Sequence, residues 1–310
     1  MEVGQEYEIK NFTHRKFSMK HIAVMTSGGD APGMNACLRA VVRAAHNNKL
    51  KIYGVLNGYE GLIDNQINKL TPREVGNIIQ KGGSILKTSR SKRFLQEKFR
   101  ALAIKNLTKK DINSLIVIGG EGSIKGAAMI AKESNLNVLG LPATIDRDLP
   151  LIGPTIGFDT AVNTALQAID RIRDTASTSN TVHIVEVMGR HCGWISLYAG
   201  ISGGAEAVIL EEFDTNIKKL TKHIKDQRTS GKTGCILIVS EGAYNAEGGD
   251  GLIRELNKIT NFDLRITKLG HIQRGGNPSA VDRVLASRLG ASAVDKLLQG
   301  CNKFVVAQPK

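Results

Sequence analysis

Aromatic side chains are scarce in this chain of 310 residues: they make up 5% of it, and there is a single tryptophan. Nucleic-acid surfaces usually interleave aromatic and basic residues, so the scarcity disfavours RNA binding. No apolar run approaches the ~18 residues of a transmembrane helix, and residues 1–18 lack the apolar core of a secretory signal. The four cysteines form no CxxC pair, which favours a reducing, cytoplasmic location.

Acidic residues are also few relative to basic ones. The chain has 42 Lys and Arg against 29 Asp and Glu, a formal net charge of +13. An excess of this size favours anionic partners: nucleic acid, a membrane surface or phosphorylated small molecules. The basic residues are scattered along the chain, so an ordinary basic surface explains the excess equally well.

Apolar runs typical of buried strands alternate with helical patterns. The strands are predicted at residues 21–26, 52–56, 114–118, 137–141, 183–188, 207–210, 235–239, 265–269 and 304–307. The helices are predicted at residues 36–47, 124–134, 160–175, 216–227 and 280–297, with a further helix beginning at Thr71. This alternation predicts an α/β fold with parallel sheets covered by helices on both faces. The number of strands exceeds one comfortable sheet, which favours two lobes.

The stretch LPATIDRD, residues 141–148, follows one of these strands and carries two carboxylates, Asp146 and Asp148. In an extended backbone this spacing places both on one side. The carboxyl ends of parallel strands are where open α/β sheets bind ligands. The stretch is therefore a candidate catalytic loop, although an Asp-rich turn before a helix has the same composition.

Two further strands end in glycine-rich turns that open helices. The first is SGGDAPGMN, residues 27–35, and the second is GGEGS, residues 119–123. Glycines let the backbone approach a phosphate, and the amides at the start of a helix point at the anion. Glu121 in the second turn suits a metal ion carried by a nucleotide. Neither spacing matches a common nucleotide-binding motif, so each turn alone is a weak signal.

Taken together, GGDAPGMNA (28–36), GGEGS (119–123), TIDRD (144–148), MGRHCG (188–193) and GHIQRGG (270–276) closely resemble the bacterial ATP-dependent 6-phosphofructokinases. The resemblance covers residues 19–310. It implies two Rossmann-like three-layer lobes with mostly parallel sheets, in a cytoplasmic homotetramer with active sites between subunits. It assigns residues 19–157 plus 273–300 to an ATP-binding lobe and residues 158–272 plus 301–310 to a fructose 6-phosphate-binding lobe. Residues 1–18 are expected to be a loosely ordered extension.

The resemblance also implies a reaction and its residues. The ATP γ-phosphate would pass to the 1-hydroxyl of fructose 6-phosphate, with Mg²⁺ as cofactor. The positions that match the family's catalytic residues are Asp146 as general base, Thr144, Arg190 and Arg90. Those that match its nucleotide site are Gly29, Arg90, Arg100, Gly120, Gly122 and Ser123, and Glu121 matches its metal ligand. Those that match its sugar-phosphate site are Thr144, Asp146, Met188, Gly189, Arg190, Glu241, Arg265, His271 and Arg274, with Arg265 coming from a neighbouring subunit.

A regulatory site for ADP or phosphoenolpyruvate is implied in part. The matching positions are Arg39, Arg43, Arg173, Gly204, Glu206 and Lys232. Pro72 and Ser230 stand where the family has basic residues, which weakens the case for effector control. Without the resemblance, Arg39 and Arg43 would be interpreted as an exposed helix face.

Three departures from the family keep alternatives open. Glu121 replaces an aspartate, Arg147 replaces an asparagine between the two aspartates, and Thr181 replaces an arginine that reaches the sugar phosphate across the subunit boundary. A cation beside Asp146 is expected to lower its basicity. The leading hypothesis is an ATP-dependent 6-phosphofructokinase, with either ordinary or reduced turnover, and the alternative is a non-catalytic, regulatory paralogue that binds nucleotide and sugar phosphate. A pyrophosphate-dependent enzyme is less favoured, because its pattern has an aspartate at Gly122 and a lysine at Ala143.

Overall fold

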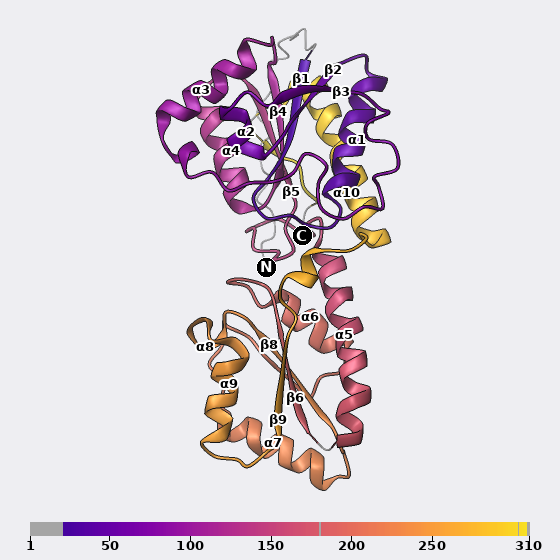
Figure 1. Ribbon diagram of the computed structural model, residues 1–310, viewed down its shortest axis with the longest axis vertical. Helices are drawn as coiled ribbons and strands as arrows, with labels where there is room; N and C mark the ends of the chain where they lie inside the picture. Colours follow the sequence, from indigo (N-terminus) through magenta and orange to yellow (C-terminus); the bar gives the residue numbers. More distant parts are fainter. Residues whose placement is uncertain (1–20, 180, 303, 309–310) are drawn as a thin grey trace, which may run out of the picture.

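Two β-sheets organise the chain, one in each lobe (Figure 1). The computed structural model describes residues 21–179, 181–302 and 304–308. The first sheet has the order β10-β5-β4-β1-β2-β3, and the second has the order β7-β8-β6-β9. The strands of the first sheet are β1 (His21–Ser27), β2 (Lys51–Val55), β3 (Ile67–Leu70), β4 (Ser114–Gly119), β5 (Asn137–Pro142) and β10 (Phe304–Val305). Those of the second are β6 (Val182–Val187), β7 (Ala207–Ile209), β8 (Cys235–Ser240) and β9 (Leu264–Lys268). Among the described strands, only the β2–β3 pairing is antiparallel.

Helices cover both faces of each sheet (Figure 1). In the first lobe they are α1 (Met34–Asn47), α2 (Gly58–Ile63), α3 (Glu97–Thr108), α4 (Glu121–Glu133) and α10 (Ala280–Leu298). In the second lobe they are α5 (Phe158–Ser179), α6 (Trp194–Ser202), α7 (Ile217–Thr229), α8 (Ala243–Ala246) and α9 (Gly248–Asn257). Two 3₁₀ turns, η1 (Arg93–Leu95) and η2 (Gly270–Arg274), complete the described elements. None of the helices in the described ranges is long and apolar enough to cross a membrane. The α/β fold with two mostly parallel sheets is therefore as predicted.

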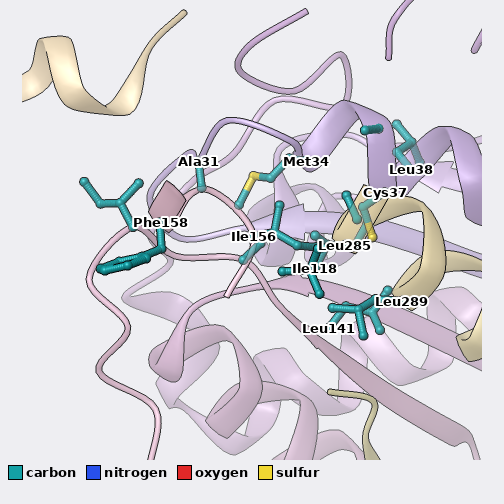
Figure 2. Close-up of a cluster of buried hydrophobic side chains, with 14 of the residues drawn as sticks. Ala31, Met34, Cys37, Leu38, Ile118, Leu141, Ile156, Phe158, Leu285 and Leu289 are labelled. Atoms are coloured by element: carbon teal, nitrogen blue, oxygen red, sulfur yellow. The ribbon is translucent and has the colours of Figure 1, made fainter. Parts of the chain in front are cut away.

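Side chains on alternate positions of the central strands face opposite helical layers. On β1, Ile22 and Val24 pack in the cluster with α1 and α10, whereas Ala23 and Met25 pack with α2, α3 and α4. Because both faces are covered, the strands are apolar without alternation, as parallel strands in three-layer folds usually are. Figure 2 shows part of the first cluster, which includes Met34 of α1, Leu141 of β5, Leu285 of α10 and Phe158 at the start of α5.

Asp282 joins the two lobes at this junction. It is fully buried in the first turn of α10. One carboxylate oxygen accepts a hydrogen bond from the Gly157 backbone N–H at 2.9 Å, and the other accepts from the Thr160 backbone N–H at 2.8 Å and from the Thr160 hydroxyl. The carboxylate thus fixes the start of α5 against the start of α10.

We expect Asp282→Ala to lower the free energy of unfolding by about 3 kcal/mol, because it leaves buried amides without an acceptor. Urea denaturation followed by circular dichroism measures the change. Asp295→Ala, at an exposed position of the same helix, is the matched control. Equal denaturation midpoints for the two variants would contradict a junction role for Asp282.

Two expectations about the fold are wrong. No helix begins at Thr71, because residues 72–77 form turns. Asn77 adopts a left-handed φ of 54°, a conformation that a right-handed helix does not continue through. Residues 301–310 do not join the second lobe in their described part, because Phe304 and Val305 pair with Leu139 and Gly140 of β5. The extension expected over residues 1–18 lies outside the described residues.

Several short elements carried too weak a pattern to be predicted: β3, α2, α3, α6, α8 and α9. The helices α2 and α9 contain glycines, which lower helix propensity. In β3, an edge strand, only Ile67 and Leu70 are buried. Tertiary packing therefore stabilises these segments more than local preference does.

Candidate active site

A cavity of about 460 Å³ opens at the carboxyl ends of β1, β4 and β5. Its volume lies within the usual range for a small-molecule site. Among the residues singled out from the sequence, those that line it include Gly29, Arg90, Gly120, Glu121, Gly122, Ser123, Thr144, Asp146, Asp148, Arg190 and Arg274. Segments more than 200 residues apart in the chain therefore meet at one point.

The glycine turn after β1 forms one wall of the cavity. A Cβ atom on Gly29 would collide with the guanidinium of Arg274, which comes from η2. A larger residue at this position would therefore force the end of the Arg274 side chain to move, whereas the sequence pattern had assigned Gly29 only to phosphate access. The cavity wall itself depends on η2 lying against the first lobe.

Glu121 begins α4 at the second glycine turn. Its carboxylate forms an ion pair with Lys125 at 2.6 Å, and the side chain is 40% exposed. The hydrogen bond from Lys125 lowers the pKa of Glu121, and the more distant Arg190 adds to this. Within the described residues, no cluster of three His, Cys, Asp or Glu side chains could hold a metal by itself.

Magnesium usually binds through one or two carboxylates together with substrate phosphates. Glu121 beside glycine-rich turns provides such a half-site, and Asp148 lines the same cavity with a buried oxygen that has no hydrogen-bond partner. The residues present therefore fit a metal that arrives with a nucleotide.

Asp146 lines the cavity as an almost fully buried carboxylate. It is 6% exposed, and its Oδ1 atom has no hydrogen-bond partner. Burial raises the pKa of Asp146 to about 6, with the negative charge of Asp148 acting in the same direction and Arg274 opposing it. A carboxylate with a raised pKa is a stronger base than a solvated one.

The pKa of Asp146 is raised, whereas the sequence led us to expect that Arg147 would lower it. The backbone of Arg147 adopts a left-handed φ of 54°. The guanidinium lies among aromatic rings, with its carbon 5.2 Å from the centroid of Phe158. Burial and the surrounding carboxylates therefore dominate at Asp146, whose pKa rises.

Arg190 brings the second lobe into the cavity. It lies in the turn after β6, where the Glu241 carboxylate accepts hydrogen bonds from the backbone N–H groups of Gly189 at 3.2 Å and Arg190 at 2.8 Å. Among the described residues, no ion pair involves the guanidinium of Arg90, Arg190 or Arg274. These cations are available to anionic ligands.

Other predicted site residues lie outside the cavity lining: Arg100, Met188, Gly189, Glu241, Arg265 and His271. Arg100 forms an ion pair with Glu133 at 2.7 Å and donates to the Leu95 carbonyl at 2.8 Å. Arg265 lies on the edge strand β9, 64% exposed, paired with Asp263 at 3.2 Å. Thr181, where the family has an arginine, is buried, and its hydroxyl lies 2.9 Å from that of Ser179.

The residues of the expected regulatory site fall into two groups. Arg173 lies 3.7 Å from the Glu206 carboxylate, donates to the Gly204 carbonyl at 2.8 Å, and shares Glu206 with Lys232. Arg39 and Arg43 lie on α1 in the other lobe. Within one chain, the two groups belong to different lobes.

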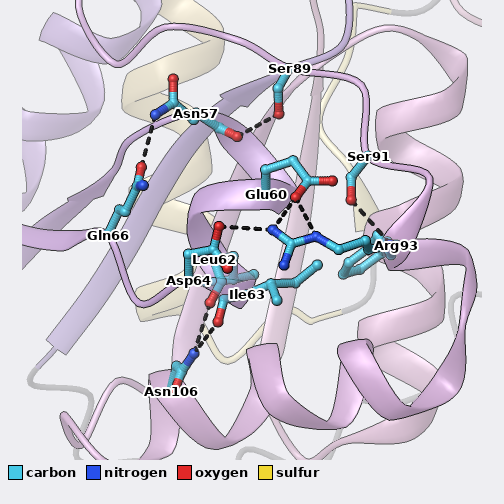
Figure 3. A network of polar contacts seen from close by, with 11 residues as sticks. Asn57, Glu60, Leu62, Ile63, Asp64, Gln66, Ser89, Ser91, Arg93 and Asn106 are labelled. Carbon is cyan, nitrogen blue, oxygen red and sulfur yellow. Dashed lines mark hydrogen bonds and ion pairs between the residues drawn. The ribbon is translucent and has the colours of Figure 1, made fainter.

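An aromatic wall of the cavity was missed from the sequence. The rings of Tyr59 and Phe94 stack with centroids 4.0 Å apart, and the Tyr59 hydroxyl donates to the Ser123 carbonyl at 2.6 Å. Figure 3 shows what positions this wall: Arg93 donates to Glu60 at 2.7 Å and to Asp64 at 2.8 Å, which ties the loop before Phe94 to α2. The one available signal was Phe94 beside the basic cluster Arg90, Lys92 and Arg93.

Phosphoryl transfer needs little covalent chemistry from a protein, because positioning and fixed positive charge supply most of the catalysis. Glycine-rich turns, guanidinium groups without ion pairs and a buried carboxylate meet here at the carboxyl edge of a parallel sheet. This combination suits an α/β protein that binds phosphorylated ligands.

Comparison with known proteins identifies the family to which the chain belongs. The family model described as Phosphofructokinase matches residues 21–297. A Thermus thermophilus protein named ATP-dependent 6-phosphofructokinase 1 is 48% identical over 94% of this chain and 90% of its own length. A Staphylococcus epidermidis protein named ATP-dependent 6-phosphofructokinase is 50% identical over 91% of this chain and 87% of its own. The solved phosphofructokinase from Saccharomyces cerevisiae superposes with a TM-score of 0.85 at 35% identity, covering 90% of this chain and 42% of that chain. The chain belongs to the phosphofructokinase family.

Proposed function

We propose that this protein is an ATP-dependent 6-phosphofructokinase, a glycolytic phosphotransferase of the cytoplasm. It transfers the ATP γ-phosphoryl group to the 1-hydroxyl of fructose 6-phosphate and yields fructose 1,6-bisphosphate and ADP. The observation that carries the proposal is the buried Asp146 carboxylate, which has an unpartnered oxygen in the same cavity as the glycine turns and Arg190. Relatives about half identical over nearly the whole chain carry this name.

The first lobe, residues 21–157 plus 273–300 together with β10, would bind ATP. Gly29, Gly120, Gly122 and Ser123 offer backbone and small side chains to the phosphates. The stacked rings of Tyr59 and Phe94 offer an apolar wall to the base. Arg100 acts indirectly, by holding the carbonyls of Phe94 and Leu95.

Asp146 would take the proton of the attacking sugar hydroxyl at its free Oδ1 atom. Arg90 and Arg190 would balance the negative charge on the transferring phosphoryl group from opposite lobes. Thr144 supports the base, because its Oγ1 atom accepts the Asp146 backbone N–H at 3.2 Å. Magnesium held by Glu121 and the ATP phosphates would neutralise further phosphate charge.

The second lobe, residues 158–272, would bind fructose 6-phosphate. Met188, Gly189, Arg190 and Glu241 form the turn beside the cavity, and His271 and Arg274 come from η2. Arginines suit the 6-phosphate because they form paired hydrogen bonds with it. The family resemblance implies a homotetramer, and Arg265, exposed on an edge strand, is accessible to a neighbouring subunit.

The effector site would also form between subunits, because Arg39 and Arg43 belong to a different lobe from Arg173, Gly204, Glu206 and Lys232. ADP or phosphoenolpyruvate would then compete with Glu206 for Arg173 and Lys232. This arrangement couples effector binding to assembly.

A coupled assay of the purified protein with fructose 6-phosphate and either ATP or pyrophosphate tests the function. We expect product with ATP and Mg²⁺ and none with pyrophosphate. Product with neither donor, together with retained ATP binding, would instead indicate the non-catalytic paralogue. Light scattering tests the tetramer in the same preparation.

Glu121→Asp tests the metal assignment. The shorter carboxylate moves away from Lys125, which pairs with Glu121 at 2.6 Å, and restores the aspartate that the family has at this position. We expect activity at limiting Mg²⁺ to stay equal or to rise by about twofold to fivefold, because the lysine then competes less with the metal. A magnesium titration of both proteins measures this. Loss of activity in the variant would show that the site is adapted to glutamate.

A further inference from the structure

Arg147 is enclosed by aromatic side chains from the second lobe. Its guanidinium carbon lies 5.2 Å from the Phe158 centroid, 5.2 Å from that of Trp194 and 5.6 Å from that of Tyr198. One guanidinium nitrogen donates to the Tyr198 hydroxyl at 3.1 Å. Each distance is within the range of a cation–π contact, and no ion pair within the described residues involves Arg147.

The aromatic side chains also contact one another. The Phe158 and Tyr198 centroids are 5.1 Å apart at 84°, and those of Trp194 and Tyr198 are 6.1 Å apart at 65°. Both arrangements are edge-to-face, which is a favourable geometry for aromatic pairs. Arg147 therefore enters a preformed cluster, where its planar guanidinium can lie against rings in a way that an ammonium group cannot.

This cluster links the two halves of the proposed active site. Arg147 lies directly after Asp146, in the loop that follows β5 of the first sheet. Trp194 and Tyr198 belong to α6, which begins immediately after the turn that carries Arg190. Asp146 and Arg190 both line the main cavity. Arg147 lines a separate cavity with Phe158 and Tyr198.

We propose that Arg147 is a positioning residue: its aromatic clamp holds the loop of Asp146 at a fixed distance from the Arg190 turn across the lobe boundary. The proposal rests on the proposed function, and it reverses the role that the sequence alone suggested for Arg147. Arg147 adopts a left-handed φ of 54°, and its guanidinium contacts the rings of Phe158, Trp194 and Tyr198, so the clamp acts through the loop that carries it.

Arg147→Asn tests the clamp. Asparagine tolerates a left-handed φ better than most residues, so the variant keeps the loop conformation available while it removes the guanidinium. We expect kcat to fall about tenfold, because a displaced base loses alignment with the hydroxyl. The KM for ATP should change by less than about twofold, because other loops bind the nucleotide. Arg147→Lys should recover part of kcat through the remaining cation–π contact. Arg171→Asn, at an exposed position of α5, is the matched control.

Two readouts separate positioning from general structural damage. Trp194 is the single tryptophan, so tryptophan-selective fluorescence reports the clamp directly. We expect the emission of Trp194, which is 38% exposed in the parent protein, to change in Arg147→Asn, because the indole loses its contact with the guanidinium. The acidic limb of the kcat profile should move below pH 6, because a released loop exposes Asp146. If the variant only removed a nearby positive charge, the pKa of Asp146 would rise and the acidic limb would move to higher pH.

The outcomes are distinct. An active parent protein whose Arg147→Asn variant shows the fluorescence change, with unchanged kcat and pH limb, would overturn the clamp and leave the proposed function intact. A variant with higher kcat would show that Arg147 opposes the base. An inactive parent protein would overturn the proposed function and this role together. Trp194→Leu removes one wall without altering the loop, and it should lower kcat severalfold if the clamp holds.

Discussion

Asp146→Asn is expected to lower kcat by ~10²-fold or more, while the KM values for both substrates change little. Asparagine keeps the size of the side chain and its place in the wall but accepts no proton. The residue is 6% exposed with an unpartnered Oδ1, so no other group compensates at that atom. Steady-state kinetics with fructose 6-phosphate and ATP measure the effect.

The pH dependence sharpens this prediction. Burial, reinforced by Asp148, raises the pKa of Asp146 to about 6. A base acts in its deprotonated form, so activity of the parent protein should rise as the pH increases through about 6 and level off above it. The variant should lack this rise. Equal turnover in the two proteins, or the same acidic limb in both, would remove Asp146 from the role of general base.

Arg190→Gln is expected to lower kcat/KM for fructose 6-phosphate by ~10²-fold to 10³-fold. Burial dominates the raised pKa of Asp146, and Arg190 opposes it; at Glu121, Lys125 lowers the pKa and Arg190 adds to it. One cation thus acts on both the proposed base and the proposed metal ligand. Removal of this cation is expected to weaken both the stabilisation of negative charge on the transferring phosphoryl group and the binding of the substrate phosphate.

Arg288→Gln, at an exposed position of α10, is the matched control for Arg190→Gln, since it removes the same charge far from the cavity lining. We expect it to retain parent activity. Thermal denaturation should give similar midpoints for both variants, because the Arg190 side chain is exposed. If both variants lose activity equally, net charge rather than Arg190 governs the reaction.

The positions of the main strands and long helices were predictable from the sequence, because apolar periodicity and glycine turns are local features. The cavity residues Gly29, Glu121 and Asp146 each follow such a strand. Because parallel strands end at the same edge of a sheet, the sequence was enough to predict that these three residues lie close together. Arg190 and Arg274 were matched to the site only by resemblance to a family. Their approach to the first lobe depends on packing between segments distant in the chain.

The sequence by itself determined the α/β class, the strand-to-loop positions of the motifs and the family resemblance, because these depend on residue order. Only the tertiary structure decided what Arg147 contacts, because the aromatic rings around its guanidinium come from α5 and α6, which are distant from it in the chain or belong to the other lobe. The tertiary structure likewise decided the return of β10 to the first sheet and the raised pKa of Asp146. Strand pairing and burial depend on neighbours in space, which residue order does not specify.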